Sequence, residues 1–373
     1  MIYFDNSATT FFKPNTVKSA VMDCINTLCT NPGRGSHGLS VKASVLVYDT
    51  RSTLASFVSL KNEQRMIFTL NCSDALNLAI LGSIKKGSHV ITTCFEHNSV
   101  LRPLFAKSKD VDVTILSPTT RFSNLSANQV EKAIRKNTTT VIVNHVSNVN
   151  GSIQPIEEIG KVCKKHGITF IVDGAQSVGH IDVSMEKQGI SMLSIAPHKG
   201  IHGIMGVGCL AVDEQVEITP IRFGGTGTFS HELNQPTSMP EGYEVGTLPL
   251  CAISSIIPAI NWCNENKTTN RSHISSLSRL CLQNLSNMDG ITLYTKLDSE
   301  NGIIAFNSNS HTSSYVCDYL YQNYQICCRC GFHCAPLMHE FLGTNKHGCV
   351  RISLGVDNTE EEIFTLIKAL ERI

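Results

Sequence analysis

Short apolar runs alternate with segments of helical spacing through the first two-thirds of this chain. The apolar runs predict strands at residues 65–70, 89–95, 111–116, 140–146 and 169–173. Apolar residues at helical spacing between them predict helices at 73–84, 126–136 and 155–166. Such alternation favours a mainly parallel sheet with helices on both faces. We therefore expect an α/β fold for this part of the chain.

After residue 249 the pattern changes to that of a smaller α+β domain. It predicts helices at 250–264, 271–287 and 313–324, and strands at 291–294, 302–306, 325–329 and 349–354. A last helix should begin at Thr359, because Glu362 follows at capping-box spacing and apolar residues then repeat on one face. We predict a large domain at 15–255 and a small domain made of 1–14 and 256–373.

Composition excludes some function classes. The 373 residues carry 31 basic and 31 acidic side chains with no basic run, so nucleic acid is not an expected partner. No apolar window approaches the length of a membrane span and no charged leader is visible, so we expect a cytoplasmic protein without a membrane partner. The fifteen cysteines are spread through apolar segments and are expected to be reduced, buried small hydrophobes.

The candidate chemistry centres on Asp173 and Lys199. Asp173 ends an apolar strand, and Lys199 follows the next apolar run and precedes the glycine-rich stretch 200–208. Pyridoxal phosphate (PLP) requires this pair, because a carboxylate keeps the ring nitrogen protonated and an amine holds the aldehyde as a Schiff base. The sequence therefore predicts a PLP enzyme.

Other polar residues also follow predicted strands. The turn at 71–74 joins a strand to a helix, where N–H groups and the Ser73 hydroxyl could receive a phosphate; a plain N-cap at Ser73 is the alternative. His97 could lie over the cofactor ring or be a structural histidine. Asn148 and Gln176 close two further strands. Ligands bind at the carboxyl ends of strands in open α/β sheets, so we expect these residues to meet there.

These segments together resemble the class V aminotransferase group of fold-type I PLP enzymes, and within it the cysteine desulfurases and selenocysteine lyases. The matching motifs occur in family order at 3–10, 31–37, 96–99, 145–148, 172–176, 198–199, 243–247, 329–336 and 350–353. The resemblance therefore covers essentially the whole chain. It implies a large domain with a mainly parallel seven-stranded sheet and a smaller α+β C-terminal domain.

The resemblance also implies roles for single residues. Lys199 would form the Schiff base, Asp173 would pair with the ring nitrogen, and Arg351 with Asn148 would bind the substrate carboxylate. His97 would stack on the ring and assist proton transfer. The remaining cofactor contacts would come from Cys72 (through its backbone), Ser73, Asn148, Gln176, His198, and from Gly246 and Thr247 reaching across a homodimer with shared active sites.

Two positions depart from the family pattern. Ala196, three residues before the lysine, stands where a hydroxyl residue is frequent, and Cys72 stands where Thr or Ala is frequent. We expect Cys72 to contribute only its backbone N–H. Both changes weaken the expected phosphate shell.

Cys334 decides between reaction classes. In cysteine desulfurases a loop thiolate at this place attacks the sulfur of cofactor-bound cysteine, which leaves a persulfide and releases alanine. We predict this activity, with L-cysteine as substrate and a possible sulfur-acceptor protein as partner. The alternatives are selenocysteine lyase, an aminotransferase or lyase acting on another small amino acid with Cys334 idle, or a scaffold with a degenerate site.

A metal site is the rival explanation for the crowded segment 327–334. Zinc sites usually combine two separated pairs of ligands, and this segment is one patch. In a strand, Cys328 and Cys330 face one side while Cys327 faces the other, so these thiols cannot converge. We therefore predict no metal, and packing roles for Cys327 and Cys328.

Overall fold

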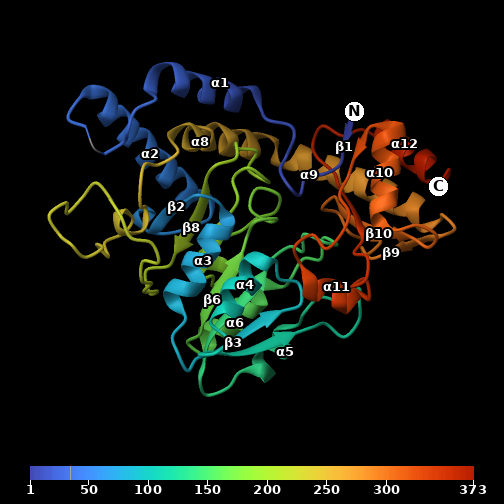
Figure 1. Cartoon of the computed structure of the whole chain (residues 1–373), viewed down its shortest axis with the longest axis horizontal. Helices are drawn as coiled ribbons and strands as arrows, with labels where there is room; N and C mark the ends of the chain where they lie inside the picture. The colour runs from blue at the N-terminus through green and yellow to red at the C-terminus, as the bar shows by residue number, and fades with distance from the viewer. Residues whose placement is uncertain (34) are drawn as a thin grey trace.

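A computed structural model describes residues 1–33 and 35–373 of the chain; Arg34, within the motif at 31–37, lies outside the described residues. Its centre is a seven-stranded sheet in the order β2-β8-β7-β6-β5-β3-β4 (Figure 1). The strands are β2 (Met66–Thr69), β3 (His89–Thr93), β4 (Asp112–Leu116), β5 (Thr138–Asn144), β6 (Thr169–Asp173), β7 (Met192–Ile195) and β8 (Gly208–Val212). Strand β8 runs antiparallel to both of its neighbours, and the other pairs are parallel. The predicted mainly parallel sheet is confirmed.

Helices cover both faces of this sheet, which explains why its central strands are almost wholly buried. One face packs against α3 (Cys72–Ser83) and α4 (Asn98–Ala106). The other face packs against a larger set: α1 (Asn15–Asp23), α2 (Gly38–Phe57), α5 (Ala127–Ala133), α6 (Ile156–Lys165), α7 (Met185–Gln188), α8 (Leu250–Ser254) and the first half of α9 (Ile256–Ser286). Alternate strand residues therefore enter two separate cores.

The C-terminal part contains a three-stranded antiparallel sheet in the order β12-β10-β9. Its strands are β9 (Ile291–Leu293), β10 (Ile303–Ser308) and β12 (Val350–Ser353), and α10 (Ser313–Tyr324), α11 (Pro336–Leu342) and α12 (Glu360–Leu370) accompany them. Strand β1 (Ile2–Tyr3) pairs with β11 (Ile326–Cys327), so the N-terminal strand lies beside the C-terminal part (Figure 1). The predicted capping box of the last helix is present between Thr359 and Glu362. The domain boundaries remain a prediction.

One predicted break is wrong. We expected two helices at 250–264 and 271–287, whereas α9 runs unbroken from Ile256 to Ser286. The residues between 264 and 271 are polar but contain no Gly or Pro, so nothing interrupts the backbone ladder. Ile260 packs in the sheet core and Leu282 in the C-terminal core, so this one helix joins the two. Within the described ranges, no helix combines the length and apolarity needed to cross a membrane.

Candidate active site

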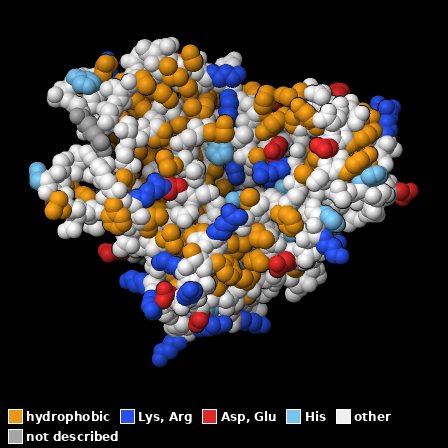
Figure 2. All heavy atoms as spheres, viewed as in Figure 1, with side chains coloured by type: hydrophobic (Ala, Val, Ile, Leu, Met, Phe, Trp, Pro, Cys, Tyr) orange, Lys and Arg blue, Asp and Glu red, His pale blue; other side chains and the backbone are white. Residues whose placement is uncertain are grey.

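A cavity of about 240 Å³ lies at the carboxyl ends of β5, β6 and β7 and the N-terminus of α3. The segment 329–334 and β12 contribute its opposite wall. On this face of the molecule, Figure 2 shows basic, acidic and histidine side chains gathered around a hollow between the two parts. The lining includes all predicted site residues except Gly246 and Thr247: Cys72, Ser73, His97, Asn148, Asp173, Gln176, His198, Lys199, Cys334 and Arg351.

Lys199 lies in the turn that follows β7. Burial lowers the pKa of its amine, which favours the neutral, nucleophilic form. The preceding carbonyl oxygen, that of His198, accepts hydrogen bonds from Thr9 Oγ1 (3.2 Å), Thr10 Oγ1 (3.1 Å) and Lys13 Nζ (3.1 Å). The N-terminal segment therefore fixes the turn that carries the lysine.

Asp173 ends β6 and is buried beneath the cavity. Its Oδ1 accepts hydrogen bonds from the Ala175 N–H (3.0 Å) and the Ser194 hydroxyl (3.3 Å). The Cys72 thiol lies 3.9 Å from the same oxygen, and burial, with the Asp173 charge, raises the pKa of this thiol to about 12. The thiol of Cys72 therefore lies against the carboxylate of Asp173, and the expectation that Cys72 contributes only its backbone N–H to the phosphate stays a prediction.

The N-terminus of α3 forms the corner predicted to receive the phosphate. Asn71 caps this helix by accepting a hydrogen bond from the Asp74 N–H (3.0 Å), so the alternative of an N-cap at Ser73 is wrong. The hydroxyls of Ser73 and Ser99 lie 2.5 Å apart at the same corner. Backbone N–H groups and the helix dipole favour an anion there.

His97 caps α4, since its Nδ1 accepts a hydrogen bond from the Ser99 N–H (3.0 Å). Its Nδ1 also lies 2.8 Å from the Ser99 hydroxyl. Burial is the main cause that lowers the pKa of His97 to about 4. The ring is thus neutral at physiological pH, as a group that exchanges protons must be before it accepts one. His198, also in the lining, has a pKa lowered to about 4 by burial.

Arg351 lies on β12 and is 1% exposed. Its Nη2 contacts Asp5 Oδ1 at 2.6 Å, and its Nη1 donates to the Asn148 carbonyl at 2.9 Å. Its Nε has no hydrogen-bond partner within residues 1–33 and 35–373. The guanidinium is therefore held in place by the protein while Arg351 lines the cavity.

Cys334 lies in a loop with unusual backbone geometry. His333 and Cys334 both have left-handed φ angles, of 46° and 57°, which non-glycine residues adopt only where surrounding contacts enforce them. Two such contacts are present: Asn148 Nδ2 donates to the His333 carbonyl (2.7 Å), and the Asn98 N–H donates to the Cys334 carbonyl (2.6 Å). The Cys334 thiol is consequently exposed at the edge of the cavity.

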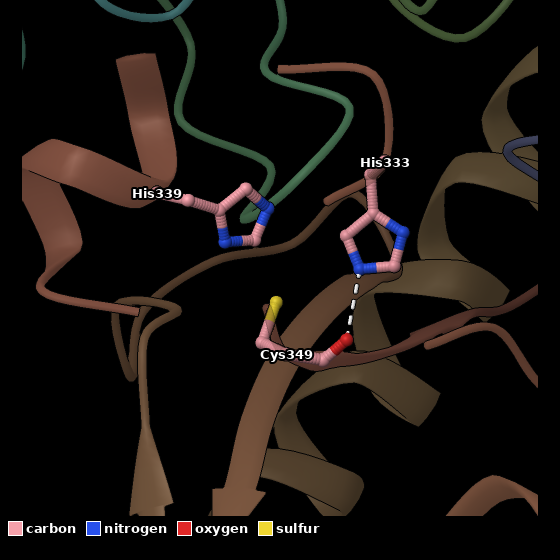
Figure 3. Close-up of side chains that lie close together, drawn as sticks. All are labelled: His333, His339 and Cys349. Atoms are coloured by element: carbon pink, nitrogen blue, oxygen red, sulfur yellow. Dashed lines mark hydrogen bonds between the residues drawn. The ribbon is translucent and has the colours of Figure 1, made fainter. Parts of the chain in front are cut away.

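The His333 side chain turns into the protein (Figure 3). Its Nε2 donates to the Cys349 carbonyl (3.0 Å), and burial lowers its pKa to about 2. Ligand atoms of His333, His339 and Cys349 lie within 4.8 Å of one another. His333 uses Nε2 for a carbonyl, and His339 uses Nδ1 for the Thr344 hydroxyl (2.7 Å). The absence of a metal stays a prediction.

Gly246 and Thr247 lie outside the cavity of their own chain. Gly246, with φ of 92°, borders another hollow beside Arg51 and Glu244. Arg51 binds Glu244 through two hydrogen bonds of 2.7 and 2.9 Å, and both side chains are buried. This ion pair anchors the segment, and its reach into a neighbouring subunit stays a prediction.

Sequence reasoning missed several residues of the cavity. Arg329, Asn144, Ser7 and Ser99 line it, and Asp5 binds Arg351. The motifs at 3–10, 96–99 and 329–336 contained four of these five residues, all but Asn144, but assigned them no role. Only their arrangement in the fold shows which of them face the cavity.

Comparisons with known proteins identify the family. The model of the family described as Aminotransferase class-V matches residues 2–366. A probable cysteine desulfurase of Methanothermobacter thermautotrophicus is 30% identical over 381 residues, covering 100% of this chain and 94% of the relative. Cysteine desulfurase IscS of Pectobacterium atrosepticum is 30% identical over 389 residues, covering 100% and 92%.

Solved structures agree. The apo structure of cysteine desulfurase from Thermococcus onnurineus NA1 superposes with a TM-score of 0.92 at 30% identity, covering 100% of this chain and 94% of that one. The cysteine desulfurase CsdA of Escherichia coli, at 21% identity and a TM-score of 0.88, covering 99% and 94%, shares the fold. The chain belongs to the class-V aminotransferase family, among the cysteine desulfurases.

Proposed function

We propose that this protein is a PLP-dependent cysteine desulfurase that converts L-cysteine to L-alanine and transfers the sulfur to Cys334. The observation that carries the proposal is the shared cavity: the exposed Cys334 thiol faces the same space as Lys199, Asp173 and Arg351. A scaffold would not need these four groups in one place. An aminotransferase would not need a thiol on a loop held in strained geometry.

The cavity fits the cofactor of the family. It offers an amine of lowered pKa at Lys199, a buried carboxylate at Asp173 and a helix N-terminus for a phosphate. The Asn148 Oδ1 is buried without a hydrogen-bond partner in the described part of the chain, and a ring hydroxyl would satisfy it. When bound, PLP supplies a protonated ring that accepts the electron pair of the substrate α-carbon.

Each residue then has a task. Arg351 binds the substrate carboxylate through its guanidinium, which Asp5 and the Asn148 carbonyl hold in position. Lys199 takes the α-proton and later returns a proton to carbon. His97, neutral at physiological pH, handles the proton at the substrate sulfur.

Cys334 performs the sulfur transfer. Its thiolate attacks the substrate sulfur, so a sulfur–sulfur bond forms while the carbon–sulfur bond breaks. The electron pair of the broken bond stays with the substrate, which leaves as alanine after protonation. The exposed position of Cys334 allows a sulfur-acceptor protein to reach the persulfide, and we place this reaction in the cytoplasm.

A homodimer is part of the proposal. Apolar side chains are exposed along the α1–α2 region and in the segment 223–233. They are Met22, Ile25, Leu39, Val41, Val45, Tyr48, Phe223, Phe229 and Leu233. Covering this surface with a second copy would remove it from water and would bring Gly246 and Thr247 toward the partner's phosphate site.

The test is Cys334→Ser, with Cys327→Ser as the matched control. Serine keeps the shape but offers no thiolate at neutral pH, so the variant should retain cofactor absorbance and lose sulfide production from L-cysteine. The control should keep most of its activity. Sulfide release by Cys334→Ser at the wild-type rate would refute the proposal. If that variant lost turnover of L-cysteine but kept turnover of selenocysteine, the result would favour a selenocysteine lyase.

A further inference from the structure

The segment 327–330 carries three cysteines that the proposed reaction does not use. Cys328 Sγ lies 3.3 Å from the Sγ of Cys317, which projects from α10. The hydrogen bond from Cys328 and burial raise the pKa of Cys317, with a further contribution from Cys330, which follows Cys328 by two residues and is expected on the same side of the chain. Burial, followed by the charge of Cys328, raises the pKa of Cys327, and Cys317 is not among the causes of this shift. Cys328 is thus in contact with Cys317, and the alternation expected for a strand places Cys330 on the same side as Cys328.

This arrangement is close to that of a disulfide. A sulfur–sulfur bond measures about 2.05 Å, so the Cys317 and Cys328 sulfurs need to approach by roughly 1.3 Å. All three side chains are half-buried, which leaves them open to a small reagent. Cys317 is the shared partner, so a bond to Cys328 can be exchanged for a bond to Cys330 by attack of the third thiol.

We propose that Cys317, Cys328 and Cys330 form a thiol–disulfide exchange site that reacts with small-molecule disulfides. One of the three thiolates attacks a sulfur of the reagent and releases one thiol. A second thiolate then attacks the mixed disulfide and releases the other thiol. The protein loses two electrons and two thiol protons, and the reagent is reduced to two thiols. Cys317 takes part in every internal disulfide formed.

The site is connected to the cavity through Arg329, which lies between Cys328 and Cys330. Its N–H donates to the Arg351 carbonyl (3.1 Å), and the Arg351 N–H donates to the Arg329 carbonyl (2.7 Å). A disulfide from Cys317 to Cys328 or Cys330 would link α10 to the segment around Arg329, which pairs with Arg351 of β12. To form the bond, the sulfurs must approach by roughly 1.3 Å, and displacements of about 1 Å in substrate-positioning groups slow enzymes markedly. We therefore expect oxidation to raise the KM for L-cysteine about tenfold at unchanged cofactor content. Only the expected rise in KM rests on the proposed function; the disulfide chemistry does not.

Trypsin separates the possible products. The peptide 297–329 carries Cys317, Cys327 and Cys328, and the peptide 330–346 carries Cys330 and Cys334. The purified holoenzyme is treated with oxidised glutathione, its remaining thiols are alkylated, and the peptides are analysed by mass spectrometry. We expect an internal bond in the first peptide, a cross-link between the two peptides, or both, always at Cys317 and reversed by dithiothreitol.

Variants identify the partners. Cys317→Ser should form neither product, and the double variant Cys328→Ser/Cys330→Ser should form no internal disulfide at Cys317. Cys328→Ser should form only the cross-link, and Cys327→Ser, the neighbour on the other side of the strand, should behave as wild type. Full alkylation of Cys317 in oxidised wild-type protein would overturn the proposal. An oxidised enzyme with an unchanged KM would refute the connection to Arg329.

Discussion

Glu96→Gln tests how a buried carboxyl group next to the site affects stability. Glu96 is 0% exposed, and its Oε1 accepts hydrogen bonds from the Thr93 hydroxyl (2.6 Å) and the Asn144 N–H (3.0 Å). Its Oε2 has no hydrogen-bond partner among the described residues. Burial, with a smaller contribution from Asp173, raises the pKa of Glu96 to about 8. The group is therefore mostly protonated at neutral pH.

The sign of the effect follows from the two protonation states. Between an unfolded pKa of 4.5 and the folded value of about 8, the folded protein holds a proton that the unfolded chain lacks. This contribution to stability is complete below pH 4.5 and is lost as the pH rises through 8. At about 1.4 kcal/mol per pKa unit, this contribution to the free energy of unfolding amounts to about 5 kcal/mol. About 3 kcal/mol of it are lost between pH 6 and 9.

Glutamine keeps the acceptor oxygen and cannot ionise. Between pH 6 and 9, the free energy of unfolding of the Glu96→Gln protein should therefore fall by about 3 kcal/mol less than that of wild type. The variant should be the more stable of the two proteins at pH 9. Urea unfolding at fixed protein concentration, followed by the fluorescence of the single tryptophan, Trp262, measures this difference. Glu158→Gln, which removes an exposed carboxylate, is the control and should follow wild type. Equal pH dependence in wild type and Glu96→Gln would show that Glu96 is ionised when buried.

Three further substitutions test separate parts of the structure. Lys199→Ala should leave a folded protein without the absorbance of bound cofactor; a variant that keeps this band would remove Lys199 from its role. Arg351→Ala should weaken binding of L-cysteine by about 2–5 kcal/mol while cofactor affinity changes little, and an unchanged KM would place the carboxylate elsewhere. Glu244→Ala leaves the buried Arg51 charge without its partner and should lower the free energy of unfolding by about 3–5 kcal/mol in urea titrations; a smaller loss would mean that water reaches Arg51.

Local patterns predicted the elements of the fold well. The helix expected at 313–324 is α10 with the same limits, and the capping box at Thr359 is formed. These features depend on neighbouring residues, so the sequence contains them directly. The same holds for the site residues that close strands, because the fold brings all carboxyl ends of β5, β6 and β7 to one edge.

Features that depend on distant contacts could not be predicted. Asp5 and Arg351 are 346 residues apart, and no periodicity links them. The direction of the Cys72 thiol depends on the positions of Asp173 and Ser194, which come from other strands. The continuity of α9 depends on two cores that hold its ends, whereas local polarity suggested a break. In each case tertiary contacts decide between local possibilities that the sequence leaves open.

The N-terminal segment connects parts of the site that belong to different regions of the fold. Asp5 holds Arg351 of β12, the Ser7 carbonyl accepts a hydrogen bond from Gln176 after β6 (2.9 Å), and residues 9–13 hold the carbonyl next to Lys199. Strand β1, directly before this segment, pairs with β11 in the C-terminal part. Arg351, which we propose binds the substrate carboxylate, and Lys199, which we propose takes the α-proton, are thus tied to one short stretch of chain. Backbone connectivity and hydrogen bonds set the relative positions of these two residues, and this would supply the preorganisation that the proposed proton transfer at the α-carbon requires.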